Sequence, residues 1–476
     1  MVNVGQLQLY MAMKKVMLLF LLLTAGVSVF AQDYPDPTIL KDGDDYYMTH
    51  SPFVYHPGFL IWHSTNLTDW EPVCRACPEF EGSGYAPDLI KHDGRYYIYY
   101  PAGNTNYVIW ADDIRGPWSK PVDLNVGGID PGHVVGEDGR RYLFLSNGNA
   151  PLVMAQLSDD GLSIVTEPDT AYLGWQFPEE WETEGFWLEA PKLMKRGDYY
   201  YLTTAEGGTA GPATSHMVVS ARSRSIFGPW ENSPYNPIVH TYSADEPWWS
   251  KGHGTPFEGP DGKWYIVYHA YPNGFHTLGR VSIIEPVEWT EDGWYRSADS
   301  SDMRPLFCNM DLSDNFRGGQ FGWQWASWKL SGSSQLDNDM NLWLETAQDR
   351  SYCARVRVNV RNGAAGMLLF YDERAFVGLV ADTAKVTVHV GSGKSVESDN
   401  IFGRRFRVRI TNRSNKVEIA VRKMFGFKWV VLSSDIDVSG MHHNNYAGFY
   451  ALRIGLISED AFPVAFRRFR YEPVKE

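Results

Sequence analysis

Short apolar runs, each followed by a glycine-containing turn and an aromatic run, recur along the first part of the chain. The clearest copy is 189–202, in which Glu189-Ala190-Pro191-Lys192-Leu193 precedes Gly197-Asp198 and Tyr199-Tyr200-Tyr201-Leu202. Runs this short and rich in aromatics predict strands, and an Asp-Gly or Gly-Asp pair between them predicts a hairpin turn. No stretch keeps an apolar period of 3.6 residues, so we expect little α-helix.

The same unit is found five times. Its turn glycines are Gly43, Gly94, Gly139, Gly197 and Gly262, and they recur at steps of about fifty residues, the size of a four-stranded blade. A second signature that ends in tryptophan occurs at 66–70, 114–118 and 226–230, and we interpret it as the outer hairpin of a blade. The pattern predicts an all-β fold that begins with a five-bladed β-propeller over residues 32–305.

In a propeller, the first strand of each blade lines the central axis. The residues at the start of these predicted strands are Asp36, Asp88, Asp130, Glu189 and His253. At any single position, Asp-Pro and similar pairs are also ordinary turn residues before a strand. Because four of the five are acids, we expect a pocket of converging carboxylates.

After Asp292-Gly293-Trp294 the repeat stops, and residues 306–476 show a different pattern. Apolar and polar positions alternate in runs separated by Gly, Asn, Asp and Ser, which predicts a β-sandwich domain of the jelly-roll kind. The expected strands are 341–346, 352–360, 367–371, 376–380, 386–390, 406–410, 417–421, 429–432 and 450–457. A passive stabilising role and a carbohydrate-binding role both remain open for this domain.

The N-terminal residues 1–31 have the pattern of a signal peptide. Met13-Lys14-Lys15 precedes the apolar run Val16–Phe30, and Val29-Phe30-Ala31 places small residues for cleavage before Gln32. No cysteine follows the apolar run, so we expect neither a lipid anchor nor any other membrane anchor. The interpretation is a secreted or periplasmic protein.

Composition narrows the range of partners. A net charge of −14 argues against nucleic acid, and aromatic residues at 14% suit a site where rings stack on sugars. Cys74 and Cys77 have C-x-x-C spacing, but no second pair or histidine cluster accompanies them, so zinc is not indicated. A local disulfide and free thiols both remain open, and neither these cysteines nor Cys308 and Cys353 receive a catalytic role. The sequence does not indicate an oligomeric state.

Two carboxyl groups on opposite sides of an aromatic pocket are the catalytic groups that glycoside hydrolysis requires. One donates a proton to the leaving oxygen, the other activates water, and a third carboxylate nearby favours the protonated form of the acid. Held about 6.5–9.5 Å apart, the two groups would invert the anomeric carbon. The rival interpretation is a lectin-like propeller that binds sugar without cleaving it, and the presence of several acids argues against it.

The chain resembles glycoside hydrolase family 43, whose members are five-bladed propellers that invert. The resemblance runs over Asp33–Ala298 and rests on the following motifs: Asp33-Tyr34-Pro35-Asp36-Pro37, Ala86-Pro87-Asp88, Asp130-Pro131, Glu189-Ala190-Pro191, Thr204-Ala205-Glu206-Gly207-Gly208-Thr209, Ala221-Arg222-Ser223 and Gly252-His253-Gly254.

By this resemblance Asp36 is the general base, Glu189 is the general acid, and Asp130 tunes and orients the acid. The expected substrate-binding residues are Phe53, Tyr85, Asp88 and Arg280. Tyr85 stands where relatives usually have Trp, and Ala190 replaces the Gly that commonly follows the acid. His253 would lie on the axis, where the family often holds a calcium ion or a water, although no cofactor is required for the chemistry.

The resemblance implies an exo-acting inverting glycosidase that releases β-D-xylose or α-L-arabinofuranose from plant cell-wall polysaccharide or oligosaccharides. The loop 51–58 is similar to the loop that walls the sugar subsite in the family's β-xylosidases, and this loop and the appended sandwich favour β-xylosidase. Action on another sugar, such as galactose, is the alternative within the family. In such relatives one loop of the sandwich reaches the mouth of the active site and favours exo action.

Overall fold

The computed structural model describes residues 32–79, 81–298, 302–328, 336, 339–391 and 393–475. The expected signal peptide at 1–31 lies outside the described residues. In the part of the chain that the structure describes, no helix has the length and apolarity needed to cross a membrane.

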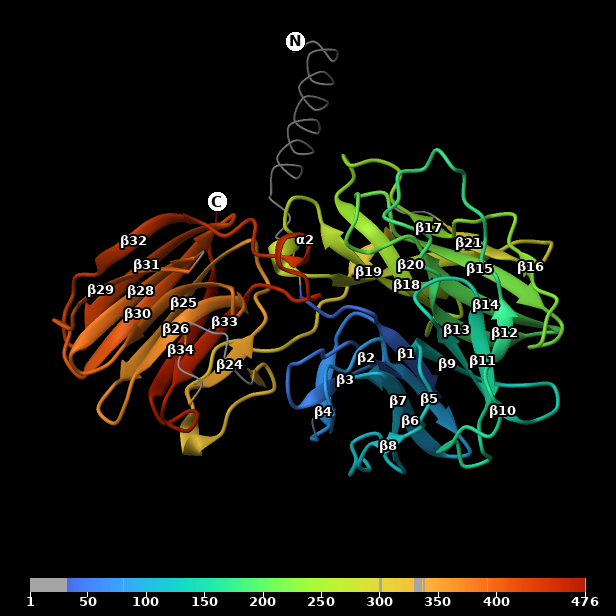
Figure 1. Cartoon of the computed structure of the whole chain (residues 1–476), viewed down its shortest axis with the longest axis horizontal. Helices are drawn as coiled ribbons and strands as arrows, with labels where there is room; N and C mark the ends of the chain where they lie inside the picture. Colours follow the sequence, from blue (N-terminus) through green and yellow to red (C-terminus); the bar gives the residue numbers. More distant parts are fainter. Residues whose placement is uncertain are drawn as a thin grey trace, which may run out of the picture. The chain divides into compact units, whose positions relative to one another are not determined.

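Five antiparallel sheets follow one another along the first part of the chain (Figure 1), as the repeat predicts. Blade I holds β1 (Thr38–Asp42), β2 (Asp45–Thr49), β3 (Gly58–Ser64) and β4 (Glu71–Cys77). Blade II holds β5 (Asp88–His92), β6 (Arg95–Ala102), β7 (Thr105–Ala111) and β8 (Val122–Asp123). Blade III holds β9 (Ile129–Val135), β10 (Arg141–Ser146), β11 (Leu152–Gln156) and β12 (Asp169–Tyr172).

Blades IV and V each add one short strand to the four of the repeat. Blade IV holds β13 (Glu189–Arg196), β14 (Tyr199–Glu206), β15 (Met217–Ser223) and β16 (Glu231–Asn232), and β17 (Val239–His240) also pairs with β15. Blade V holds β18 (Trp248–Glu258), β19 (Trp264–Pro272), β20 (Val281–Trp289) and β21 (Tyr295–Ser297), and β22 (Arg304–Pro305) also pairs with β20.

Local turn chemistry explains why the repeat folds as blades. The five turn glycines lie between the first and second strands with φ between 58° and 81°, a left-handed region that costs glycine little. The tryptophan-ending segments connect β3 to β4, β7 to β8 and β15 to β16, so their interpretation as outer hairpins is confirmed. The first strands β1, β5, β9, β13 and β18 contact one another in a closed ring around the axis.

The apolar core lies between neighbouring blades. Trp62 and Trp70 of blade I are fully buried against Val267 and Ile284 of blade V, so this cluster closes the ring. The segment before β1 strengthens the closure, because Asp33 forms a β-bridge with Val281 of β20. The propeller is therefore sealed where its first and last blades meet.

Two packed sheets form the C-terminal sandwich. The first follows the order β23 (Ala326–Trp328), β24 (Asn341–Glu345), β33 (Arg453–Ser458), β26 (Ala365–Asp372), β27 (Ala375–Ala381), β28 (Lys385–Gly391) and β29 (Lys394–Asp399). The second follows the order β32 (Val430–Asp437), β31 (Lys416–Lys423), β30 (Arg405–Arg413), β25 (Ser351–Asn359) and β34 (Phe466–Pro473).

Three of these strands were not predicted. Every residue of β29 is exposed, so the strand has no apolar face to reveal it. In β34 a register shift opposite Arg355 and Arg357 breaks the alternation, and β23 has only three residues. Helix is scarce in the described residues, as expected: the 3-10 turns η1 (His276–Leu278) and η3 (Arg317–Gly319), and the four-residue α2 (His443–Tyr446).

All four cysteines are free thiols, which decides between the two alternatives left open by the sequence. Cys74 and Cys77 both lie on β4, and residues three apart in a strand point to opposite faces. Cys74 Sγ donates to the carbonyl of Ile114, while Cys77 Sγ lies 3.7 Å from the hydroxyl of Tyr100.

The propeller and the sandwich belong to one compact unit, residues 31–476. Arg453 of β33 donates to the buried carboxylate of Asp33 at 2.9 Å, and Thr277 Oγ1 donates to Asn415 Oδ1 at 2.7 Å. The Leu452 amide also donates to the carbonyl of Thr277. These bonds hold the start of β33 and the turn between β30 and β31 against η1 and the segment before β1.

Candidate active site

A left-handed residue at the start of each blade aims side chains at the axis. Asp36, Asp130 and His253 have φ values of 54°, 54° and 57°, and Ala86 and Ala190 occupy the matching positions in blades II and IV with φ of 37° and 55°. A non-glycine residue in this region costs of order 1–3 kcal/mol, and such strain tends to be retained at functional sites. Ala190 adopts this conformation although it is not a glycine.

Three of the predicted acids gather around one imidazole. His253 Nε2 donates to Glu189 Oε1 at 3.1 Å and lies 3.7 Å from Asp130 Oδ2, while Nδ1 lies 3.6 Å from Asp36 Oδ1. Asp36 and Asp130 are almost fully buried, whereas the Glu189 side chain is 16% exposed. Asp36 and Glu189 therefore contact opposite nitrogens of a ring that keeps them apart.

Asp36 is held as an anion. Arg280 Nη1 donates to its Oδ1 at 2.8 Å, and Ser51 Oγ donates to its Oδ2 at 2.5 Å. Burial raises the pKa of Asp36, but the charges of Arg280 and His253 and a hydrogen bond from His269 outweigh it, so the pKa lies well below the usual 3.8. A carboxylate in this state accepts protons only weakly but is ionised at every working pH.

His269 lies between Asp36 and Arg280. Its Nδ1 lies 3.0 Å from Asp36 Oδ1 and 3.1 Å from the Asp36 amide, which points its N–H at this nitrogen. On the other side of the ring, Nε2 lies 3.5 Å from Arg280 Nη1 and 3.0 Å from Thr209 Oγ1. Burial, and then Arg280, lower the pKa of His269 to about 3, so the ring is neutral.

Asp130 carries the raised carboxyl pKa of the cluster. Burial raises its pKa to about 7, the negative charges of Glu189 and Asp36 add to the shift, and His253 opposes it. The sequence analysis assigned the protonated form to the acid Glu189, favoured by a third carboxylate nearby, and this assignment stays a prediction. Asp130 is the more buried of the two carboxyls, and Trp187, two residues before Glu189, is 39% exposed and does not line the cavity.

His253 is a buried cation. Burial lowers its pKa, but Asp36, the hydrogen bond to Glu189 and Asp130 raise it to about 9. His216, whose Nε2 lies 4.0 Å from Glu189, has a pKa well below 6.5 because of burial and the neighbouring histidines. At neutral pH one imidazolium thus stands among the carboxylates.

The donor atoms fit the expected calcium ion poorly. Among the described residues, two groups have ligand atoms close enough to share a metal: Asp36 with His253 and His269, and Glu189 with His216 and His253. Both groups are rich in nitrogen, whereas calcium takes six to eight oxygen ligands. The His253 imidazolium supplies positive charge at the same point, so we derive no step through calcium, and the ion stays a prediction.

The raised pKa of His253 has a consequence for stability. Protonated His253 stabilises the folded state fully below the usual pKa of 6.5, and this contribution is lost as the pH rises through 9. The shift corresponds to about 3 kcal/mol in the free energy of unfolding. Asp130, with a pKa of about 7, is largely ionised above pH 8, so thermal unfolding between pH 8 and pH 9.5 should show the loss due to His253.

The groups that face His253 are Asp36, Asp130, Glu189, His216, His269 and Arg280. A His253→Gln variant lacks the titrating ring and should show a much flatter profile over the same pH range. An equally steep decline in that variant would trace the loss to another group.

A cavity of about 350 Å³ lies over this cluster. Phe53 and Tyr85, the two predicted aromatic residues, both line it, and their rings are stacked with centroids 6.4 Å apart. Gly448, Phe449 and Tyr450 of the sandwich close one side, and the Phe449 ring lies 6.4 Å from Phe53 and 4.8 Å from the Arg280 guanidinium. The loop between α2 and β33 is thus the part of the sandwich that reaches the pocket.

Of the two remaining predicted residues, Arg280 lines the cavity and Asp88 does not. Arg280 is 3% exposed and is paired with Asp36. Asp88 does not line the cavity: it pairs with Lys192 at 2.9 Å and accepts a hydrogen bond from the His133 amide. Counted back from the hairpin turn, Ala86 matches Asp36, and Asp88 matches Thr38, which is already inside the strand.

Several residues of the site were not singled out from the sequence. Thr209 is the last residue of a motif that supports the resemblance, and Ser51 is the first residue of the loop that carries Phe53. Both could therefore have been predicted as site residues from the sequence. His269 lies within the apolar strand β19 and His216 directly precedes the apolar strand β15, where a buried structural ring is the default interpretation. Phe449 carries no sequence signal, because its place depends on how the sandwich docks.

Comparisons with known proteins agree with this geometry. The profile of glycosyl hydrolases family 43 matches residues 26–295. A xylan 1,3-beta-xylosidase of Vibrio sp is 33% identical over 55% of this chain and 55% of its own length. The non-reducing end alpha-L-arabinofuranosidase BoGH43B of Bacteroides ovatus is 34% identical over 55% of this chain and 51% of its own length. The chain thus spans about half the length of these curated relatives.

A solved structure extends the likeness to both domains. The xylan beta-1,4-xylosidase from Bacillus Halodurans C-125 superposes with a TM-score of 0.80 over 93% of this chain and 99% of its own, at 24% identity. That likeness concerns the fold. Because the family profile covers more than half of the sequence, the chain belongs to glycosyl hydrolase family 43.

Proposed function

We propose that this protein is an exo-acting, inverting glycoside hydrolase that releases a terminal pentose from plant cell-wall polysaccharide or oligosaccharides. The observation that carries the proposal is the placing of Asp36 and Glu189 on opposite nitrogens of His253, beneath a pocket walled by Phe53 and Tyr85. Two separated carboxyls under aromatic walls are what acid and base catalysis of glycosidic cleavage requires.

The environments of the carboxyls divide the roles. Asp36, ionised by Arg280 and His269, would accept a proton from the attacking water. Glu189, the most exposed of the three, would donate a proton to the oxygen of the leaving group. Asp130 accepts a hydrogen bond from the Ala190 amide at 3.1 Å and so orients the backbone beside Glu189. When Asp130 is protonated, the cluster also carries less negative charge.

The closed end of the pocket supports exo action. Phe449 and Tyr450 line the cavity next to Phe53, so they would block a long polymer on that side. The terminal sugar would then lie between the aromatic rings and the carboxylates. The Arg280 guanidinium packs against the Phe449 ring, donates to Asp36 and would contact a sugar in this space.

The sugar is tested by hydrolysis of nitrophenyl β-D-xyloside against nitrophenyl α-L-arabinofuranoside. One relative is named a xylosidase and another an arabinofuranosidase. We favour xylose because of the loop 51–58, which carries Phe53. Proton NMR of the first anomer released from xylobiose should show inversion. Cleavage of neither glycoside would refute a pentosidase, and retention would refute the roles of Asp36 and water.

The contribution of the sandwich is tested by Phe449→Ala. Removing the ring forfeits part of the roughly 1.5–3 kcal/mol that a buried Phe side chain contributes, so we expect KM for xylo-oligosaccharides to rise about tenfold, with a smaller change in kcat. Steady-state kinetics measure the split. Val396→Ala, which removes an apolar sandwich side chain that is 63% exposed, is the control. Equal kinetics in the two variants would remove Phe449 from the site.

We also infer export. The support is the basic and apolar pattern of residues 13–31, which precedes the first described strand. N-terminal sequencing of the protein from the medium or periplasm should begin at Gln32.

A further inference from the structure

Four arginines stand in one row across the outward face of the five-stranded sandwich sheet. Arg467 of β34 is directly opposite Arg357 of β25, which is opposite Arg407 of β30, which is opposite Arg422 of β31. Their neighbours along the strands, such as Val358 and Val408, are buried in the sandwich core. We call these four residues the arginine row.

The arginine row has no acidic partners, unlike the row beside it. In the adjacent row, Arg355 pairs with Glu472, and Arg409 pairs with Glu418 at 2.8 Å. Within the described part of the chain, no carboxylate forms an ion pair with a member of the arginine row, and Arg467 donates only to the carbonyls of Pro463 and Phe466.

This arrangement is unfavourable in the free protein. Like charges directly opposite on neighbouring strands destabilise a sheet. The Nε atoms of Arg407 and Arg422 are buried without a hydrogen-bond partner. Burial, and then the neighbouring arginines, lower the pKa of Arg357 and Arg407. An anion that lies along the row would relieve the repulsion between the guanidiniums.

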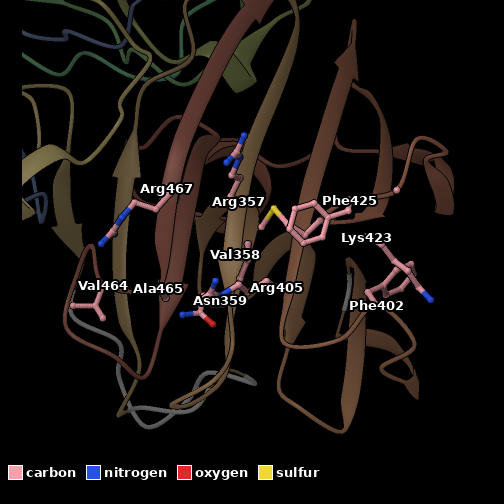
Figure 2. Close-up of a pocket in the computed structure, with 12 residues that line it drawn as sticks. Arg357, Val358, Asn359, Phe402, Arg405, Lys423, Phe425, Val464, Ala465 and Arg467 are labelled. Atoms are coloured by element: carbon pink, nitrogen blue, oxygen red, sulfur yellow. The ribbon is translucent and has the colours of Figure 1, made fainter.

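A groove of about 900 Å³ opens at one end of the row (Figure 2). Its lining includes the cations Arg357, Arg405, Lys423 and Arg467 and no carboxylate among the described residues. Figure 2 shows Arg467, Arg357 and Phe425 following one another across the sheet.

Exposed aromatic rings accompany the cations. Phe425 and Phe427 are 93% and 97% exposed, in a connection between β31 and β32 that also carries Trp429. The Trp429 ring packs against the guanidiniums of Arg409 and Arg422 at 4.7 and 4.8 Å. Rings of this kind offer flat apolar surfaces beside the charges.

We propose that the arginine row and its groove bind an anionic polysaccharide that carries uronic acid carboxylates. The guanidinium fork matches a carboxylate with two parallel hydrogen bonds. Neighbouring strands lie roughly 4.8 Å apart, so the row is extended and suits a polymer better than one small ion. The exposed rings beside it would stack on sugar faces, which a simple counter-ion would not use.

Charge directs the choice of partner. The whole chain carries −14, so the row is a local positive strip on an acidic protein, and the surrounding negative charge repels the densely charged nucleic acids and anionic membranes more than a polysaccharide in which only some sugars carry a carboxylate. The choice of a polysaccharide rests on the proposed function, because uronic acids decorate the polymers that contain pentoses. The row would hold such a polymer while the separate propeller pocket cleaves it.

The test is affinity electrophoresis of the full chain in gels that contain glucuronoxylan, with the same polymer after carboxyl reduction as the matched probe. We expect retardation that salt weakens and that falls at least tenfold when the carboxyls are reduced. Equal retardation by the reduced polymer, or no retardation by either, would overturn the proposal.

The variant Arg357→Gln/Arg407→Gln/Arg422→Gln should lose at least tenfold in retardation while its Tm stays equal or rises, because repulsion is relieved. Its control, Arg95→Gln/Arg115→Gln/Arg224→Gln, removes the same charge from propeller arginines that pair with Asp112, Asp113 and Asp198. We expect the control to bind as the parent does. Unchanged binding in the row variant would overturn the proposal.

Other occupants are separate outcomes. Equally strong binding to a DNA oligonucleotide or to phosphatidylserine vesicles, or a change in oligomeric mass caused by the row variant, would replace the polysaccharide with that partner. Hydrolysis of nitrophenyl pentosides is measured on each protein. Hydrolysis without retardation refutes this inference alone, whereas retardation without hydrolysis refutes the proposed function alone.

Discussion

Glu189→Gln should lower kcat on xylobiose by about 10²–10⁴-fold, the usual contribution of a general acid. The amide keeps the shape of the side chain, and its oxygen can still accept the hydrogen bond from His253 Nε2. It cannot deliver a proton to the leaving sugar. Nitrophenol needs less protonation as it leaves, so the loss on nitrophenyl xyloside should be clearly smaller than the loss on xylobiose.

The measurement is kcat on both substrates together with the binding of xylose by calorimetry. Binding should persist in the variant, because the ring walls and Arg280 are untouched. Glu182→Gln changes an exposed glutamate in the same segment and serves as the matched control. A loss of equal size on both substrates would show that Glu189 is not the acid, and full activity on xylobiose would show the same.

Asp36→Asn should remove both turnover and part of the stability. A neutral amide is a far weaker base toward water, so we expect kcat to fall by about 10²–10⁴-fold on every substrate, whatever its leaving group. The same change leaves Arg280 and His253 without their shared counter-ion in a buried site, and breaking a buried pair from one side typically costs about 3–5 kcal/mol. Thermal unfolding and single-turnover kinetics separate the two effects.

Ser51→Ala is the control for Asp36, because it removes the hydrogen bond to Oδ2 and leaves the charge. It should cost about 1–3 kcal/mol in stability, as expected for a lost hydrogen bond to a charged group, and retain most of kcat. If Asp36→Asn keeps kcat within tenfold of the parent, water is activated by another group. The pKa of His253 should also fall in Asp36→Asn, because Asp36 is the charge that raises it most.

The raised pKa of Asp130 changes how the cluster is understood. A carboxyl with a pKa of about 7 is partly protonated at neutral pH, so the site need not hold three anions beside one imidazolium. Such coupled groups share their protons, and the pH profile of kcat reports the cluster as a whole rather than one residue.

The architecture could be predicted from the sequence because its determinants are local. A glycine in a two-residue turn and alternating apolar positions specify a hairpin wherever they occur, and five evenly spaced copies have few ways to bury their faces other than a ring of blades. The convergence of Asp36, Asp130, Glu189 and His253 on the axis followed from that ring, because each residue lies on or directly before the innermost strand of its blade.

Tertiary structure decided what local patterns do not encode. Ala86, and not Asp88, occupies the position in blade II that matches Asp36 in blade I. Asp88 lies two residues further along the chain, at the start of β5, where it pairs with Lys192. Protonation depends on burial and on charges from other blades, so the raised carboxyl pKa belongs to Asp130. Phe449 enters the pocket only because the sandwich docks beside blade V. Strand pairing likewise aligns arginines that are more than one hundred residues apart into one row, since register is a property of the sheet and not of any single strand.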